Sequence, residues 1–165
     1  MTKTQGVRAR IDTSEGSMPF EFFPDKAPGH VESFVKLSEK GFYDGTVFHR
    51  VIAGFMIQGG CPQGDGRGGP GYTIRAEFND THHGRGILSM ARSSDPDSAG
   101  SQFFVCHGDA GFLDGQYTAF GRLIEGDDTL DKIAKSPVAR GAGGENSKPR
   151  NPVKISKVTI LHPEK

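Results

Sequence analysis

Residues 48–60 read FHRVIAGFMIQGG, and this stretch is the most informative part of the sequence for the fold. It overlaps two short apolar runs, Val47 to Ile52 and Phe55 to Gln58, which are typical of β-strands. Ala53-Gly54 breaks the pattern between them. Arg50 lies inside the first run, where an unpaired charge would be costly, so we expect its side chain to have a specific role.

Further short strands are predicted on both sides of this stretch. They are Val7 to Ile11, Phe20 to Phe23, Tyr72 to Ala76, Ile87 to Ala91, Phe103 to Cys106, Thr118 to Leu123, and a final strand from Val153 to Ile160 whose alternation slips at Ser156-Lys157. The chain holds 24 glycines, about twice the usual share, and glycine suits tight turns and bulges. Ser14 to Ser17 supplies turn residues between the first two strands, and residues 59–71 and 136–152 are expected to be loops.

Only two helices are predicted. The first begins at Pro28 and ends before Gly41, with apolar residues at helical spacing between them. The second runs from Gly126 to Ala134, with Asp127 or Asp128 as its N-cap. Many strands with only two helices favour a mainly β fold, a closed antiparallel barrel whose open ends the helices cover.

Length and composition favour one domain that includes residues 1–165. The 20 basic residues balance the 20 acidic ones, so we expect no nucleic-acid partner. No apolar run approaches the ~20 residues that span a bilayer, and residues 1–10 lack the apolar stretch of a signal peptide. Cys61 and Cys106 do not form a disulfide framework. We therefore expect a cytoplasmic protein with no membrane partner.

A glycine-rich motif at Gly64 to Gly69 matches the pattern G-x-G-x-x-G of dinucleotide sites. Such a site needs a helix that offers its N-terminus to phosphate, whereas Pro70-Gly71 and a strand-like run follow here. The motif is expected to be a loop whose glycines adopt positive φ angles.

Metal and hydrolase chemistry are also disfavoured. His82-His83, His107 and the two cysteines lack the spacing of known zinc motifs. Ser101 lacks the G-x-S-x-G context of a hydrolase nucleophile, and nothing in the sequence pairs it with a base.

Three segments together closely resemble the cyclophilin family. They are residues 48–60, residues 86–91 (GILSMA), and residues 100–106 (GSQFFVC) followed by FLDG at 112–115 and FG at 120–121. The resemblance extends from about residue 6 to residue 161, and residues 27–28 and 41–45 match as well. It implies an eight-stranded antiparallel barrel capped by two helices, with a proline-binding site on its outer face. It also implies a peptidyl-prolyl cis-trans isomerase that acts on proline-containing polypeptides without a metal or another cofactor.

The residues suit this chemistry. Amide resonance resists rotation by ~18–20 kcal/mol, so a catalyst must favour the twisted bond, in which the proline nitrogen regains a lone pair. Arg50 is a fixed cation with several hydrogen-bond donors, and Gln58 is expected to orient it. By resemblance, Phe55, Met56, Phe104, Phe112, Leu113 and Tyr117 line the substrate pocket, while Gln102 and the backbone of Ala91 and Arg92 hold the peptide on either side. His49 is left out of the site, because its ring is expected to make internal hydrogen bonds.

Three positions depart from the family pattern. Phe112 stands where many members have Trp, Tyr117 where many have His, and Arg92 where many have Asn. The resemblance implies that loss of the indole N–H weakens binding of cyclosporin-type inhibitors more than it affects catalysis. Arg92 is expected to reach solvent beside the peptide and to favour acidic substrates, unless Asp95 and Asp97 neutralise it.

Two functions stay open at this point. The favoured one is an active isomerase that assists folding, and the alternative is a proline-peptide binding module with little turnover. Retention of Arg50 with Phe55, Met56 and Gln58 favours the enzyme. We expect the protein to be a monomer.

Overall fold

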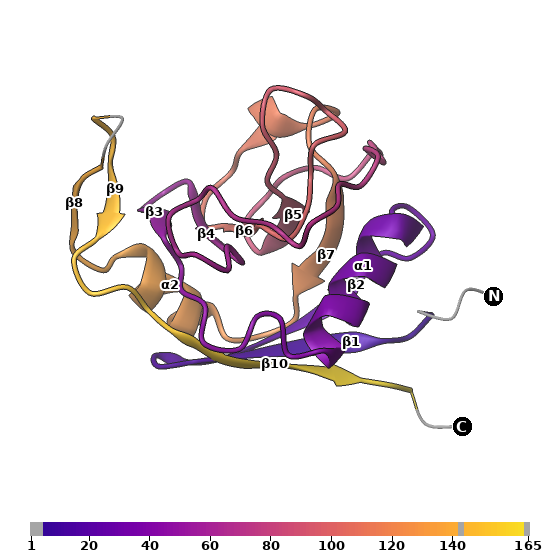
Figure 1. The fold of residues 1–165 in the computed structure, drawn as a ribbon, viewed down its shortest axis with the longest axis horizontal. Helices are drawn as coiled ribbons and strands as arrows, with labels where there is room; N and C mark the ends of the chain where they lie inside the picture. Colours follow the sequence, from indigo (N-terminus) through magenta and orange to yellow (C-terminus); the bar gives the residue numbers. More distant parts are fainter. Residues whose placement is uncertain (1–4, 142–143, 164–165) are drawn as a thin grey trace.

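The computed structural model describes residues 5–141 and 144–163, which form a mainly β fold with two α-helices (Figure 1). In chain order the first elements are β1 (Arg8–Thr13), β2 (Gly16–Phe22), α1 (Pro28–Glu39), β3 (Arg50–Ile52), β4 (Met56–Gly59) and β5 (Ile87–Met90). They are followed by β6 (Phe103–Cys106), the 3-10 helix η1 (Gly111–Leu113), β7 (Ala119–Leu123), α2 (Asp127–Ala134), β8 (Val138–Arg140), β9 (Asn146–Pro149) and β10 (Ile155–Leu161). Among the described residues, no helix is long and apolar enough to cross a membrane.

Eight of the strands form one antiparallel sheet in the order β10-β1-β2-β7-β5-β6-β4-β3, and this sheet curls strongly (Figure 1). Its end strands, β10 and β3, do not pair with each other. The residues that precede them meet instead: Val47 forms an isolated bridge with Lys154, and the Phe48 N–H donates to the Val153 carbonyl at 3.0 Å. The prediction of a closed barrel is therefore wrong, because the sheet is an open half-barrel. With three residues, β3 is short, and β9 packs against it.

The segment 136–152, expected to be a loop, contains the hairpin of β8 and β9. This hairpin forms a two-stranded sheet of its own, and β9 lies beside β3 of the curled sheet (Figure 1). In β9 the buried positions are Ser147 and Pro149, which alternate with exposed Asn146 and Lys148. The alternation is that of a strand, but polar residues and proline hide it from a pattern based on hydrophobicity.

The predicted strand from Tyr72 to Ala76 is also wrong. Only Ile74 pairs there, in an isolated bridge with Ala99. The Ala76 N–H donates to the Asp97 carboxylate at 2.8 Å instead of to another strand. Side-chain acceptors of this kind compete with a strand ladder for backbone donors.

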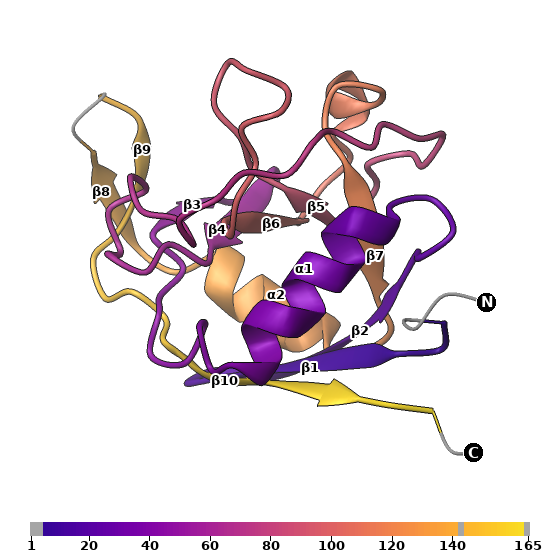
Figure 2. The same ribbon diagram turned by 45° about the vertical axis from the view of Figure 1, so that its right-hand side comes forward.

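The two helices contact different strands, as Figures 1 and 2 show. Helix α1 packs against β10 and β7, and α2 packs against β2, β3 and β4. As predicted, α1 begins at Pro28, and Gly41 lies just past its end with φ +75°. The range predicted for α2 is correct to within one residue, but its predicted N-cap is wrong, because Gly126, with φ +92°, takes that position instead of Asp127 or Asp128.

Close packing explains the glycine at the start of α2. A Cβ at Gly126 would lie 2.9 Å from the Ser17 carbonyl oxygen, and the left-handed φ disfavours other residues. Asp127 and Asp128 occupy the first turn of the helix, where a negative charge is favourable.

The slip expected in the last strand is a bulge. Asp12 pairs with Lys157, but the next residue, Thr13, pairs with Ile155. Ser156 is therefore the extra residue, and its hydroxyl donates to the Asp12 carbonyl at 3.0 Å.

Strand β6 separates two apolar clusters. Because successive side chains point to opposite faces, Phe103 and Val105 enter the main core, whereas Phe104 and Cys106 enter a second cluster. In the main core, Phe34 of α1 lies 5.5 Å from Phe103, measured between ring centroids. The second cluster also contains Met56, Ala110 and Leu113, and it forms the floor of the site described next.

Candidate active site

The strand register gathers the predicted site residues on one face of the sheet. Gln58 on β4 pairs with Arg50 on β3 and with Phe104 on β6. Directly opposite residues in antiparallel strands point to the same face, so these three side chains form a row. Met56, two residues from Gln58, lies on the same face in the next row.

A cavity of about 310 Å³ lies over this row. Nine of the eleven predicted site residues line it: Arg50, Phe55, Met56, Gln58, Ala91, Arg92, Phe104, Leu113 and Tyr117. Phe104 and Leu113 are buried in the second cluster, and Tyr117 packs edge-on against Phe104 with ring centroids 5.9 Å apart. The cavity is thus apolar on one side and carries the Arg50 guanidinium on the other.

Arg50 is held from two directions. Its Nε donates to Glu145 Oε1 at 2.9 Å and its Nη2 to Glu145 Oε2 at 3.0 Å. Its Nη1 donates to Gln58 Oε1 at 3.2 Å. Hydrogen bonding to Arg50 lowers the pKa of Glu145 to about 2, and the same pair raises the pKa of Arg50. Both groups therefore stay charged at neutral pH.

The hydrogen bonds continue from Gln58 across the site. Gln58 Nε2 donates to Gln102 Oε1 at 3.1 Å. Gln102 Nε2 in turn donates to the carbonyls of Gly66 and Gly68, each at 2.9 Å. The side-chain amides of Gln58 and Gln102 each accept a hydrogen bond through oxygen and donate through nitrogen, so these contacts determine the orientation of both amides.

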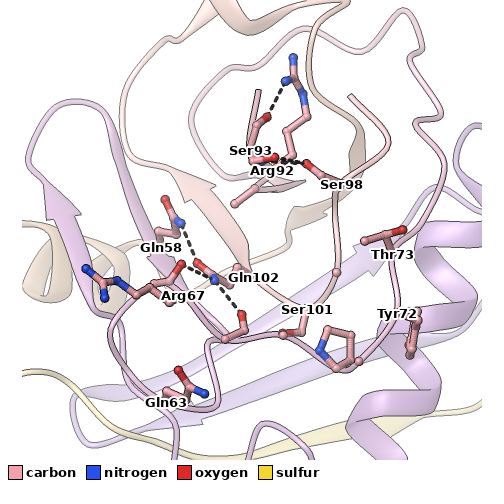
Figure 3. A pocket seen from close by; sticks show the side chains of 17 residues that line it. Gln58, Gln63, Arg67, Tyr72, Thr73, Arg92, Ser93, Ser98, Ser101 and Gln102 are labelled. Atoms are coloured by element: carbon pink, nitrogen blue, oxygen red, sulfur yellow. Dashed lines mark hydrogen bonds between the residues drawn. The ribbon is translucent and has the colours of Figure 1, made fainter. Parts of the chain in front are cut away.

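Gln102 does not line the apolar cavity, but it lines a second hollow of about 650 Å³ (Figure 3). The two hollows share Gln58, Gly66, Ala91 and Arg92 in their walls. Figure 3 shows Gln58 and Gln102 on one side of the second hollow and Tyr72 and Thr73 on another. The two hollows therefore lie next to each other, on either side of a shared wall.

The Arg92 side chain does not extend freely into solvent. Its Nε and Nη2 donate to the Gln116 carbonyl at 3.0 and 2.7 Å, and its Nη1 donates to the Ser93 carbonyl at 2.9 Å. The guanidinium carbon lies 4.5 Å from the centroid of the Tyr117 ring, a cation–π contact. Backbone carbonyls therefore hold this guanidinium, and not the carboxylates of Asp95 and Asp97, which the sequence offered as the alternative to a solvent-facing side chain.

The backbone near Arg92 is partly used inside the chain. The Ala91 N–H donates to the Gln102 carbonyl at 2.9 Å, an antiparallel contact between β5 and β6 continued past their ends. The backbone group of Ala91 that could contact a bound peptide is therefore its carbonyl oxygen, because its N–H is already used.

Phe112 does not line either hollow, and 66% of its surface is exposed. Its ring packs against Phe55, with centroids 5.5 Å apart. Phe112 thus extends the apolar surface beyond the cavity instead of forming its wall.

Sequence reasoning missed three residues of the cavity: His49, Asp65 and Gly66. His49 was expected to make internal hydrogen bonds, but its buried Nδ1 has no partner among the described residues. Burial, followed by the charge of Arg50, lowers the pKa of His49. Its position next to Arg50 was the available signal, whereas Asp65 and Gly66 lie in a glycine-rich loop without a pattern.

A polar network supports η1, which carries Phe112 and Leu113. The His82 ring bonds to Asp114 Oδ2 at 2.6 Å and to Asp109 Oδ2 at 2.9 Å. The buried His83 ring bonds to Asp114 Oδ1 and to the Ser89 hydroxyl, both at 2.9 Å. Hydrogen bonds to Asp109 and Asp114 raise the pKa of His82 to about 9, and those to the histidines and the His83 N–H lower the pKa of Asp114 to about 2.

The motif from Gly64 to Gly69 is a loop, as expected. Gly64 and Gly66 have φ angles of +73° and +84°, and no helix follows the motif. Within residues 5–141 and 144–163, no group of three or more His, Cys, Asp or Glu side chains is arranged to hold a metal ion.

Comparison with protein families gives one match over most of the chain. Residues 8–160 match the family described as cyclophilin type peptidyl-prolyl cis-trans isomerase/CLD. A peptidyl-prolyl cis-trans isomerase of Synechococcus elongatus is 51% identical over 130 residues, which cover 79% of this chain and 88% of the relative. Peptidyl-prolyl cis-trans isomerase B of Bacillus subtilis is 52% identical over 109 residues, which cover 65% of this chain and 76% of the relative.

A solved structure is also similar. It is a cyclophilin-type peptidyl-prolyl cis-trans isomerase of Cryptosporidium parvum, in the presence of the dipeptide Ala-Pro. The TM-score is 0.87 at 36% identity, and the match covers 94% of this chain and 99% of that one.

Proposed function

The chain belongs to the family of cyclophilin-type peptidyl-prolyl cis-trans isomerases, and from this premise we propose that Arg50 drives its reaction without a covalent intermediate. The protein is an isomerase of X–Pro peptide bonds. These bonds interconvert slowly because amide resonance imposes a barrier of ~18–20 kcal/mol. The catalyst must therefore bind the twisted bond more tightly than either planar isomer.

The proposed binding mode places the proline ring in the apolar cavity. Phe55, Met56, Phe104 and Leu113 would contact the ring, and burial of its apolar surface would fix the proline against the sheet. Gln102 and the Ala91 carbonyl would hold the chain before the proline along the second hollow. The supporting observation is that the two hollows share a wall.

In the proposed mechanism, Arg50 donates hydrogen bonds to the twisted amide. As resonance is lost, the proline nitrogen becomes pyramidal and accepts a hydrogen bond, while the guanidinium holds the proline carbonyl. The apolar side of the cavity reduces screening by water and strengthens this interaction. The observation that carries the proposal is a guanidinium that lies at the edge of an apolar cavity and is already oriented by Gln58 and Glu145.

Substitution of Arg50 tests the mechanism. Arg50→Ala should reduce kcat/KM for a proline peptide by about 10²–10³-fold, the usual cost of one preorganised donor, with the fold intact. Arg50→Lys should restore little, because an ammonium lacks the planar donor fork. A protease-coupled isomerisation assay measures both variants, and circular dichroism checks the fold. Turnover like that of the unmodified protein in Arg50→Ala would exclude the mechanism. Peptide binding without turnover in the unmodified protein would favour a binding module.

We also propose that cyclosporin-type inhibitors bind this protein less tightly than relatives with Trp at position 112. The missing indole N–H is worth ~0.5–1.5 kcal/mol, so Phe112→Trp should tighten binding by about tenfold. The exposed ring of Phe112 leaves room for the larger side chain. Calorimetric titration of both proteins measures the difference, and equal affinities would contradict the proposal. A monomeric state and a cytoplasmic location stay predictions.

A further inference from the structure

We infer that Glu145 is a positioning residue for Arg50: it orients the guanidinium toward the proline without itself touching substrate. This inference rests on the proposed role of Arg50. Glu145 lies between β8 and β9, 95 residues along the chain from Arg50.

The contact is a bidentate ion pair. The two carboxylate oxygens of Glu145 accept from Nε and Nη2, which form one edge of the planar guanidinium. Paired bonds of this kind restrict orientation as well as distance, because rotation of the plane lengthens at least one of them. Without such a contact, a long side chain that is 36% exposed would sample many rotamers.

The number of N–H donors on Arg50 shows how many are left for substrate. A guanidinium has five N–H groups. Glu145 accepts two of them and Gln58 accepts a third, among the contacts of the described residues. One N–H on Nη1 and one on Nη2 are left, and Arg50 lines the apolar cavity. Glu145 and Gln58 together therefore select which donors meet the twisted amide.

The hairpin gives Glu145 a defined position. The Glu145 carbonyl accepts from the Gly141 N–H at 2.8 Å and from the Ser147 N–H at 3.0 Å. Strand β9 then packs against β3, the strand that begins with Arg50. The carboxylate is thus attached to a structure that contacts the same strand as its partner.

A carboxylate also reduces the positive potential of the guanidinium, and this effect opposes the benefit of orientation. Glu145 acts on the edge formed by Nε and Nη2, whereas the remaining donors would contact substrate directly. Small displacements of a catalytic group can cost far more than a modest loss of potential. We therefore expect removal of Glu145 to slow the reaction.

The central experiment compares Glu145→Ala, Glu145→Gln and the control Glu21→Gln. Glu21 also forms an exposed ion pair with an arginine, Arg122, through a single contact and away from the site. Glu145→Ala should lower kcat about two- to fivefold, the range of an exposed ion pair, with KM nearly unchanged. Glu145→Gln keeps one acceptor oxygen, so its kcat should lie between those of Glu145→Ala and the unmodified protein. The kcat of Glu21→Gln should equal that of the unmodified protein. The difference between Glu145→Ala and the unmodified protein should shrink as salt rises.

Two further measurements separate positioning from a general structural role. In the Arg50→Ala background, Glu145→Ala should cause no additional loss, because its effect passes through Arg50. In ¹⁵N-labelled protein, the Arg50 Nε–H should exchange slowly with water, and Glu145→Ala should abolish this protection.

Several outcomes would overturn the inference. They are an unchanged or increased kcat in Glu145→Ala, a further loss of rate in the Arg50→Ala background, or unprotected Nε–H in the unmodified protein. If Arg50→Ala is inactive while Glu145→Ala is fully active, only the role of Glu145 is excluded. If Arg50→Ala itself is fully active, the proposed mechanism fails.

Discussion

The apolar and polar halves of the candidate site are built in different ways. The apolar half consists of Met56, Phe104 and Leu113, which belong to a buried cluster on the outer face of β4 and β6. The polar half consists of Arg50, Gln58 and Gln102, whose side chains are joined by hydrogen bonds and tied to Glu145 and to the glycine-rich loop. The first half is positioned by burial, and the second by directional contacts between distant segments.

This difference separates stability from turnover. Burial of apolar surface is a main source of folding free energy, so residues in the apolar half should stabilise the whole domain. Hydrogen bonds near solvent contribute little net stability, but they control orientation. Substitutions in the apolar half should therefore act on unfolding as well as on proline binding, whereas substitutions in the polar half should act mainly on rate.

The largest expected effect is on stability in the apolar half. Phe104→Ala should lower the free energy of unfolding by about 3–5 kcal/mol, because it empties a buried site between β4 and β5. Phe104→Leu should produce a smaller loss in the same direction and keeps the test valid if the alanine variant does not fold. Urea denaturation measures both. A loss below ~1 kcal/mol for Phe104→Ala would contradict the assignment of this half to the core.

The next effect is on rate in the polar half. Gln58→Ala breaks the hydrogen-bonded chain at its centre, so both Arg50 and Gln102 lose a partner. Loss of two hydrogen bonds of ~0.5–1.5 kcal/mol each should lower kcat/KM by about tenfold, with stability changed by only ~1 kcal/mol. Gln63→Ala is the matched control, because Gln63 lines the second hollow but takes no part in the hydrogen bonds that join Arg50, Gln58 and Gln102. If both variants lose the same activity, the hydrogen-bonded chain does not matter.

A smaller effect depends on pH and tests whether polar contacts also support the apolar half. The pKa of His82 is raised to about 9, so its stabilising effect is complete below pH 6.5 and is lost as pH rises through about 9. The pKa of Asp114 is lowered to about 2, so its contribution is present above pH 3.8 and is lost as pH falls through about 2.

The difference in Tm between the unmodified protein and His82→Ala should therefore be largest between pH 3.8 and pH 6.5, where both groups are charged, and should decrease toward pH 9. Thermal unfolding across this pH range measures it. His162→Ala is a control, since His162 contacts Glu39 on α1 rather than η1. A Tm difference that does not change with pH would show that the positive charge of His82 does not contribute to the support of η1.

The smallest effect concerns substrate charge. Because backbone carbonyls and the Tyr117 ring already engage the Arg92 guanidinium, its preference for acidic peptides should be less than about twofold and should fade with salt. The ratio of kcat/KM for acidic and basic versions of one proline peptide, measured on the unmodified protein and Arg92→Asn, tests this. A severalfold change in that ratio would mean that Arg92 releases its carbonyl contacts when substrate binds.

Much of the fold and of the apolar half followed from local sequence patterns. Alternation of apolar residues located β1, and short apolar runs located β4, β6 and β7, each to within a few residues, while Pro28 marked the start of α1. The pattern at Ser156-Lys157 correctly indicated the irregularity in β10, which is a bulge. Such signals are readable because a strand or helix repeats its environment every few residues.

The tertiary structure alone decided the open sheet and the polar contacts. Closure of the sheet depends on how its end strands meet, and no local pattern encodes that encounter. The pair of Arg50 with Glu145 joins residues 95 apart, and Gln58 meets Gln102 across 44 residues. In the sequence, Glu145 is one charged residue in a polar stretch, because a side chain acquires a partner only when packing brings two distant segments together.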